Sequence, residues 1–153
     1  MKQLELKIPP VIVFLIFVFF MWALESLLPF GQFDFYGRII FCKILIFIAV
    51  LVGIISLWQF YRAGTTIHPA KLSKVSTLVT SGLYNYSRNP MYLSLLIFLL
   101  AWGLWLGNAF NVLLAAGFVA YMNTFQIGLE EKVLLDRFGR DYKNYCILVR
   151  RWF

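Results

Sequence analysis

Residues 78–92 read LVTSGLYNYSRNPMY and bring turn-forming and polar residues together between two long apolar runs. Pro90 disfavours helical backbone at Asn89 but suits the first turn of a following helix. The stretch is therefore predicted to be a polar loop that ends at a helix N-terminus, at the entrance to an apolar segment of membrane-crossing length. The unpaired N–H groups of such a terminus attract anionic or polar ligand atoms.

The composition is that of an integral membrane protein. Hydrophobic residues make up 61% of the 153 residues and charged residues only 14%. The net charge of +7 does not indicate nucleic-acid binding, because the basic residues flank the apolar runs, as cytoplasmic Lys and Arg do. The two cysteines and the single histidine offer neither a metal-ligand spacing nor a disulfide framework, so no metal is expected.

Four apolar segments predict an all-α, polytopic membrane helical bundle that forms a single domain over residues 1–153. Each segment is long enough for a bilayer core of about 30 Å. The four transmembrane helices are expected at about 10–28, 35–61, 90–107 and 109–127. No small-x-small cleavage site follows the first run, which is therefore interpreted as a retained span rather than a secretory signal. The charged, amphipathic tail 128–153 is expected to form a helix in or near the membrane interface.

The distribution of basic residues predicts the orientation in the membrane. If both termini and the polar loop 62–89 lie in the cytoplasm, all of the 14 Lys and Arg residues except Arg38 and Lys43 fall on that side. The loop and the acidic start of the tail, Glu130-Glu131, then share one membrane face. They are expected to build one site.

Taken singly, the polar residues of this site have ordinary structural explanations. Adjacent helical residues point about 100° apart, so at most one of Glu130 and Glu131 is expected to meet a ligand directly. A solvated interfacial pair is the alternative for both. Arg88 alone is typical of a lipid-phosphate anchor, and the tyrosines of the loop are typical of interfacial aromatic residues.

Five short features that follow one another along the chain resemble the isoprenylcysteine carboxyl methyltransferase family, whose relatives include phospholipid methyltransferases. The resemblance covers roughly residues 62–153. Its pieces are LVTSGLY at 78–84, RNPMY at 88–92, a helical hairpin, Glu130-Glu131, and FGxxYxxY at 138–145. It implies an integral membrane enzyme that uses S-adenosylmethionine. It also implies that the cofactor is held by the residues matching Ser76, Thr77, Leu78, Val79, Tyr84, Asn89, Pro90, Met91, Tyr92 and Glu130.

The chemistry of these residues agrees with that assignment. Tyrosine faces stabilise a partly desolvated cation, such as a sulfonium, by about 0.5–2 kcal/mol. A carboxylate at Glu130 suits an amino group or ribose hydroxyls, and free N–H groups near Pro90 suit a carboxylate. Methyl transfer is an in-line displacement that needs mainly positioning and exclusion of water. Arg88 and Glu131 are the predicted catalytic residues, with Glu131 the nearest proton acceptor for an amine or thiol substrate.

Two departures from the family pattern narrow the substrate. Asn89 stands in place of the histidine usual in the eukaryotic motif and does not titrate near neutral pH, which argues against a proton carrier there. Gln126, the predicted substrate-binding residue, stands where prenylcysteine enzymes place an arginine that suits a carboxylate. A phospholipid or other small amphiphile is thus favoured over a prenylated protein. The short chain further suggests a minimal core from a prokaryotic inner membrane.

Two alternatives to a methyltransferase stay open. One is a relative that has kept the fold and changed the reaction, for instance to a reductase that depends on reduced nicotinamide. The other is a non-enzymatic membrane scaffold whose basic face binds anionic lipid. Binding of S-adenosylmethionine distinguishes the predicted enzyme from both.

Overall fold

A computed structural model describes residues 8–28, 30–64 and 77–153 of the chain. In this part of the chain the fold is all-α. The elements are α1 (Pro10–Leu27), α2 (Arg38–Arg62), a 3₁₀ turn (Gly82–Asn85), α3 (Pro90–Leu106), α4 (Asn111–Tyr121), a π-helical turn (Met122–Ile127) and α5 (Gly128–Leu148).

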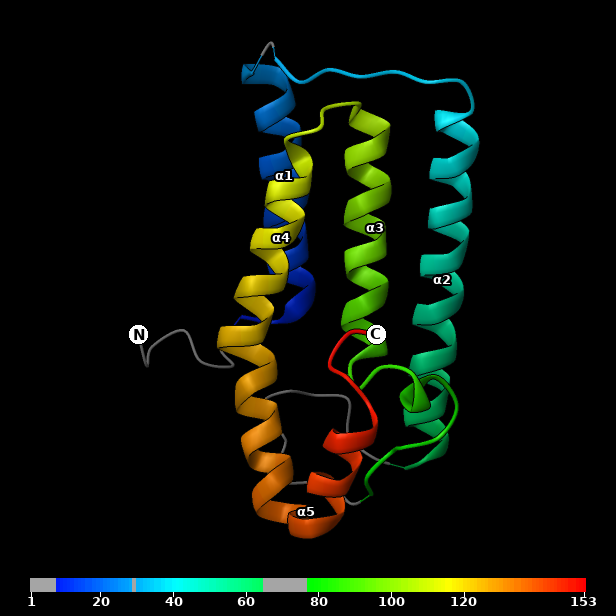
Figure 1. The fold of residues 1–153 in the computed structure, drawn as a ribbon, viewed down its shortest axis with the longest axis vertical. Coiled ribbons are helices and arrows are strands. Elements are labelled where there is room, and N and C mark those ends of the chain that lie inside the picture. The colour runs from blue at the N-terminus through cyan, green and yellow to red at the C-terminus, as the bar shows by residue number, and fades with distance from the viewer. Residues whose placement is uncertain (1–7, 29, 65–76) are drawn as a thin grey trace.

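Helix α3 is the centre of the bundle. It packs against α1, α2 and α4, and Figure 1 shows it between α2 on one side and the α1–α4 pair on the other. Its residues Leu96, Leu99 and Ala101 are buried, and Leu99 lies with Phe118 of α4 in the main apolar core. The outer helices α1 and α2 instead leave many large apolar side chains exposed. Such an exposed apolar surface suits contact with lipid.

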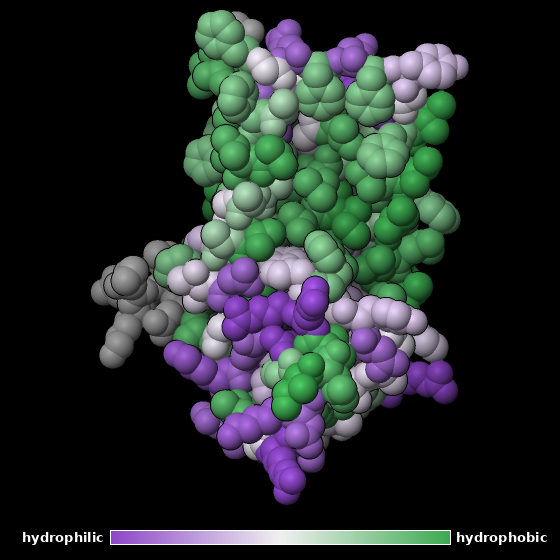
Figure 2. Space-filling view, viewed as in Figure 1, coloured by the Kyte–Doolittle hydropathy of each residue, from purple (hydrophilic) through white to green (hydrophobic). Residues whose placement is uncertain are grey.

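Within the described residues, three helices are long and apolar enough to cross a membrane: Pro10–Leu27, Arg38–Arg62 and the continuous helix Asn111–Leu148. Helix α3 is apolar but shorter, with 17 residues. The predicted all-α bundle is therefore confirmed as four helical rods, three of them long candidate spans. Figure 2 shows the resulting band of apolar side chains above a polar end.

The predicted C-terminal helix corresponds to α5, which is a direct continuation of α4. The π-helical turn joins the two without a break, and neither it nor Gly128 leaves the helical region of backbone angles. The chain reverses only at Gly139, whose φ of 50° and ψ of −114° are non-helical. Glycine adopts such positive φ values without a steric penalty. The last turns of α5 then run back toward the bundle (Figure 1).

Gly103 allows close packing inside the bundle. A Cβ added there would lie 3.1 Å from both Asn111 Cβ and Met21 Cε, so α3 approaches α4 and α1 closely at this point. Gly107 ends α3 in the left-handed region, with φ of 72°. The turn after α3 thereby starts at a position that few other residues adopt without strain.

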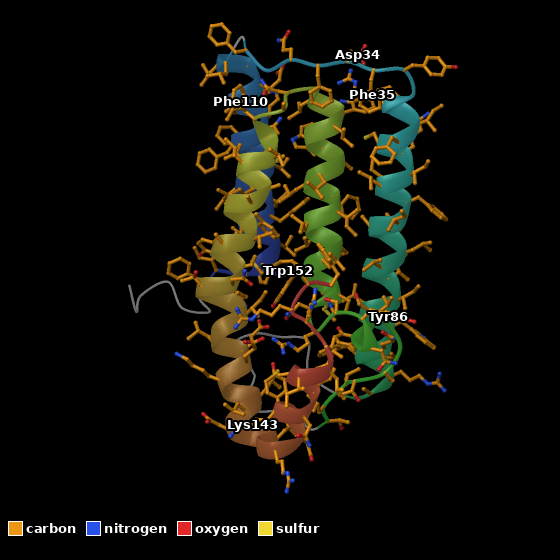
Figure 3. The ribbon with its side chains drawn as sticks, in the orientation of Figure 1. Asp34, Phe35, Tyr86, Phe110, Lys143 and Trp152 are labelled. Atoms are coloured by element: carbon orange, nitrogen blue, oxygen red, sulfur yellow. The ribbon has the colours of Figure 1, made fainter. Side chains whose placement is uncertain are left out.

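The two ends of the bundle have different roles. At one end, the α1–α2 connection is tied to the α3–α4 turn, since Phe33 N donates to Gly107 O at 2.8 Å and Asn108 Nδ2 donates to Phe30 O at 3.1 Å. Asp34 and Phe110 mark this end in Figure 3. The opposite end holds the loop before α3, the whole of α5 and the chain terminus. It therefore gathers the residues that the sequence singles out.

Candidate functional site

The loop before α3 is shaped by its glycine and proline. Gly82 has a φ of 65° and opens the 3₁₀ turn, and Pro90 begins α3 after the non-helical residue Asn89. Between them, Tyr84 is buried, with its ring centroid 5.3 Å from that of Phe60 at the end of α2. Burial raises the pKa of the Tyr84 phenol. The phenol is therefore neutral at physiological pH and keeps its proton for donation.

The far part of α5 holds this loop in place. Tyr145 Oη donates a hydrogen bond of 2.6 Å to the carbonyl oxygen of Tyr84. Tyr142, Tyr145 and Val149 form a small buried cluster against which Leu78 packs. The tyrosines of the FGxxYxxY pattern thus anchor the loop to the helix that returns after Gly139.

A first polar cluster joins three elements around Glu130. Tyr92 Oη of α3 donates to Glu130 Oε1 at 2.5 Å, and Gln126 Nε2 of the π-helical turn donates to the same oxygen at 2.9 Å. Gln126 is buried, whereas Tyr92 and Glu130 are half-buried. The cluster places a carboxylate beside the first turn of α3. The Glu130 carboxylate accepts these hydrogen bonds from neutral donors, which do not compensate its negative charge.

A second cluster surrounds Glu131 and consists of Arg88, Glu131 and Arg151; we call it the arginine–glutamate cluster. Arg88 Nη2 lies 2.8 Å from Glu131 Oε1, and Arg151 Nη2 lies 2.6 Å from Glu131 Oε2. Arg151 Nε donates to both carboxylate oxygens, at 3.0 and 3.2 Å. These hydrogen bonds raise the pKa of Arg151. The cluster carries two positive charges against one negative charge.

The C-terminal segment, residues 149–153, closes over the loop before α3. Arg88 N donates to Arg150 O at 2.9 Å, and the side chains of Ser87 and Asn89 both donate to Arg151 O at 3.1 Å. Trp152 Nε1 reaches Asn123 Oδ1 in the π-helical turn at 3.1 Å, and Figure 3 places Trp152 near the foot of α3. The segment therefore links the loop, the π-helical turn and α5.

Sequence reasoning did not predict the contribution of the C-terminal segment. Arg151 lies 20 positions beyond Glu131, and its contact depends on the chain reversal at Gly139. Neither residue spacing nor helical periodicity reports such a contact. The one feature of the sequence that could have indicated this contribution is the pair of arginines at 150–151, shortly after an amphipathic helix.

The structure brings most of the predicted site residues together. Arg88, Asn89, Tyr92, Gln126, Glu130 and Glu131 converge where the loop, α3 and α5 meet. Pro90 is buried and Met91 half-buried in the first turn of α3. Tyr84 is buried within the loop, Thr77 is exposed, and Leu78 and Val79 are half-buried. Ser76 lies outside the described residues.

The chain is similar in sequence to known proteins over part of its length. A 62-residue stretch is 52% identical to an uncharacterized protein of Haemophilus influenzae, covering 40% of this chain and 98% of that protein. The chain is also 29% identical over 103 residues to the protein-S-isoprenylcysteine O-methyltransferase of Schizosaccharomyces pombe. That match covers 61% of this chain but only 44% of the length of the yeast protein. No solved structure matches the chain.

A family model gives the broadest match. The model described as phospholipid methyltransferase matches residues 37–141, which include α2, α3, α4, both glutamates and the loop before α3. The match therefore spans more than half of the chain. It includes every residue of the two polar clusters apart from Arg151. The chain belongs to the phospholipid methyltransferase family.

Proposed function

We propose that the protein transfers a methyl group from S-adenosylmethionine to an amphiphilic acceptor at the membrane face where the loop before α3 meets α5. The observation that carries the proposal is the hydrogen bond between Tyr92 and Glu130. It joins two residues 38 positions apart, from the two segments to which the family resemblance assigns cofactor binding. Membership in a family of methyltransferases supports the same reaction class.

The groups around the first cluster fit the cofactor. Oε2 of Glu130 receives no hydrogen bond from the described residues, which leaves an acceptor for an amino group or ribose hydroxyls. The N–H groups of Met91 and Tyr92, in the first turn of α3, likewise donate to no described acceptor. Such N–H groups suit a carboxylate. When bound, S-adenosylmethionine would supply an activated methyl group on a sulfonium.

We assign cofactor binding to residues 76–79, Tyr84, the first turn of α3 from Asn89 to Tyr92, and Glu130. Arg88 and Glu131 belong to the proposed catalytic end of the site. Both oxygens of Glu131 accept hydrogen bonds from guanidinium groups. We therefore propose that Glu131 positions the two arginines, and that it accepts a proton only when one of them moves away.

A phospholipid headgroup is the acceptor that we favour. The family match points to phospholipids. The Gln126 side chain donates its hydrogen bond to Glu130, and it lacks the charged fork by which an arginine binds a substrate carboxylate. A prenylcysteine acceptor is less well supported for that reason. We further propose that the site faces the cytoplasm of a prokaryotic inner membrane, because that topology obeys the positive-inside rule.

The experiment that tests the proposal is calorimetric binding of S-adenosylhomocysteine to the full chain in detergent, followed by a labelled-methyl screen over membrane lipids. Binding and methylation of a lipid would support the enzyme. Association with anionic vesicles without any S-adenosylhomocysteine binding would favour the scaffold alternative. Turnover that depends on reduced nicotinamide would favour a changed reaction.

Tyr84→Ala is expected to weaken S-adenosylhomocysteine binding by about tenfold or more, because it removes a buried aromatic face that supports the loop. Tyr36→Ala is the matched control. Tyr36 is fully exposed and lies at the opposite end of the bundle, in the α1–α2 connection. Equal losses in the two variants, measured by calorimetry in detergent, would contradict the proposed location of the cofactor.

A further inference from the structure

We propose that the arginine–glutamate cluster is the binding site for the phosphate of the methyl acceptor, and that Arg151 supplies its open edge. The ligand class is a phosphodiester of a phospholipid headgroup. This inference rests on the proposed function, since it names the part of the substrate that the catalytic end of the site recognises. Three observations carry it: the charge of the cluster, its unused donors and its position.

The cluster has a surplus of positive charge. Two guanidinium groups share one carboxylate, Glu131, whose side chain is only 18% exposed. Glu130, the next carboxylate along α5, is directed to Tyr92 and Gln126 and forms no ion pair with either arginine. The arrangement therefore holds two cations close together while neutralising only one of them. An anion is the ligand that such an arrangement favours.

The cluster also has more hydrogen-bond donors than the described residues supply acceptors. Arg88 Nη1 and Nη2 are used by Cys146 O and Glu131, but its Nε is buried and has no partner among the described residues. Arg151 uses Nε and Nη2 on Glu131, and its Nη1 donates to no described acceptor. The Arg151 side chain is 41% exposed, so its free edge is open to a ligand. Arginine forks match phosphate oxygens in pairs.

The position of the cluster selects a lipid phosphate. Figure 2 shows hydrophilic residues gathered directly below the apolar band, which is the level at which headgroup phosphates lie in a bilayer. The cluster also adjoins the proposed cofactor site, because Glu130 and Glu131 are consecutive and Arg88 lies two residues before Pro90, the first residue of α3. A phosphate bound here keeps the rest of the same headgroup beside the methyl donor.

The test compares Arg151→Gln with Arg150→Gln. The two variants lose the same charge at adjacent positions, but Arg150 is exposed and the ion pairs to Glu131 among the described residues come from Arg88 and Arg151. Binding of dihexanoyl-phosphatidylethanolamine to the full chain in detergent is measured by calorimetry. We expect Arg151→Gln to weaken binding by about tenfold or more, as for a lost hydrogen bond to a charged group, and Arg150→Gln to leave it within about twofold.

Parallel measurements separate a phosphate site from other roles of Arg151. S-adenosylhomocysteine affinity and the thermal unfolding midpoint should stay near wild type in Arg151→Gln, and Arg151→Lys should recover part of the lipid affinity by restoring charge without the fork. Equal losses in the Arg150 and Arg151 variants would overturn the proposal in favour of general surface charge. A matching loss of S-adenosylhomocysteine affinity or of stability would overturn it in favour of a purely structural Arg151.

Two further ligands distinguish the source of the anion. Inorganic phosphate should bind more weakly than the short-chain lipid, and an alkyl carboxylate of similar chain length should also bind more weakly. The reverse order for either ligand would overturn the assignment to a lipid phosphodiester. Wild-type protein that binds the lipid but no S-adenosylhomocysteine would refute the proposed function while leaving the phosphate site supported, so the two proposals fail separately.

Discussion

Glu130→Gln is expected to weaken binding of S-adenosylhomocysteine by about tenfold to a hundredfold. The substitution keeps the size of the side chain and leaves an oxygen that can accept from Tyr92. What it removes is the negative charge, and hydrogen bonds to charged groups contribute about 1.5–3 kcal/mol each. Calorimetry in detergent, with thermal unfolding as the check of folding, measures the effect.

The control for this prediction is Asp136→Asn. Asp136 is an exposed carboxylate on the same helix, and its loss changes the net charge of the protein by the same amount. S-adenosylhomocysteine affinity in this variant should stay within about twofold of wild type, because surface charges are screened by salt. If both variants bound as wild type does, Glu130 would not contact the cofactor.

The same variant separates the enzyme from the scaffold. On the scaffold alternative, Glu130→Gln leaves the association with anionic vesicles unchanged or slightly stronger, since one negative charge is lost. If the proposed function is correct, lipid association persists while the affinity for S-adenosylhomocysteine falls. Measuring both quantities on one preparation therefore decides between the two alternatives.

The sequence predicted the convergence of the two segments for a physical reason. Pro90 sets the start of α3, and a turn of four residues between α3 and α4 brings Glu130 back to the level of Tyr92. Membrane helices of similar length joined by a tight turn must run antiparallel. The hydrophobic runs alone therefore determine which end of the bundle receives the glutamates.

The same reasoning could not predict the course of the chain after Glu131. The amphipathic pattern of the tail predicted a helix but not its direction, which follows from an unbroken π-helical turn and from one positive φ at Gly139. The contacts of Arg151 with Glu131 and of Trp152 with Asn123 depend on that direction. These contacts join residues that are far apart in the sequence and share no periodic pattern, so no local pattern predicts them.

Arg88→Ala is expected to lower the free energy of unfolding by about 3–5 kcal/mol, the usual cost of removing one partner from a buried ion pair. The Arg88 side chain is only 11% exposed, and it links the start of α5 to its end, since it donates to both Glu131 and Cys146 O. The substitution leaves the Cys146 carbonyl oxygen without the Arg88 donor and leaves Arg151 as the one arginine that pairs with Glu131 among the described residues. Denaturant titration in detergent measures the loss.

Arg62→Ala is the comparison, because Arg62 is also an arginine at this end of the bundle but is exposed and lies 5.3 Å over the Trp58 ring. An exposed cation–π contact contributes about 0.5–1 kcal/mol, so the two losses should differ severalfold. A loss in Arg88→Ala no larger than that in Arg62→Ala would mean that the ion pair is solvated and does not hold α5.

The double variant Arg88→Met, Glu131→Leu separates the cost of an unpaired charge from the value of the pair. Replacing both members of a buried pair by apolar residues is often neutral in stability, whereas removing one is not. Arg151 would lose its partner, but its exposed side chain can turn to water at small cost. We therefore expect the double variant to recover most of the stability lost in Arg88→Ala. Because it lacks two of the three residues of the arginine–glutamate cluster, it should still lose the lipid phosphate, which would show that the cluster is retained for binding and not for stability.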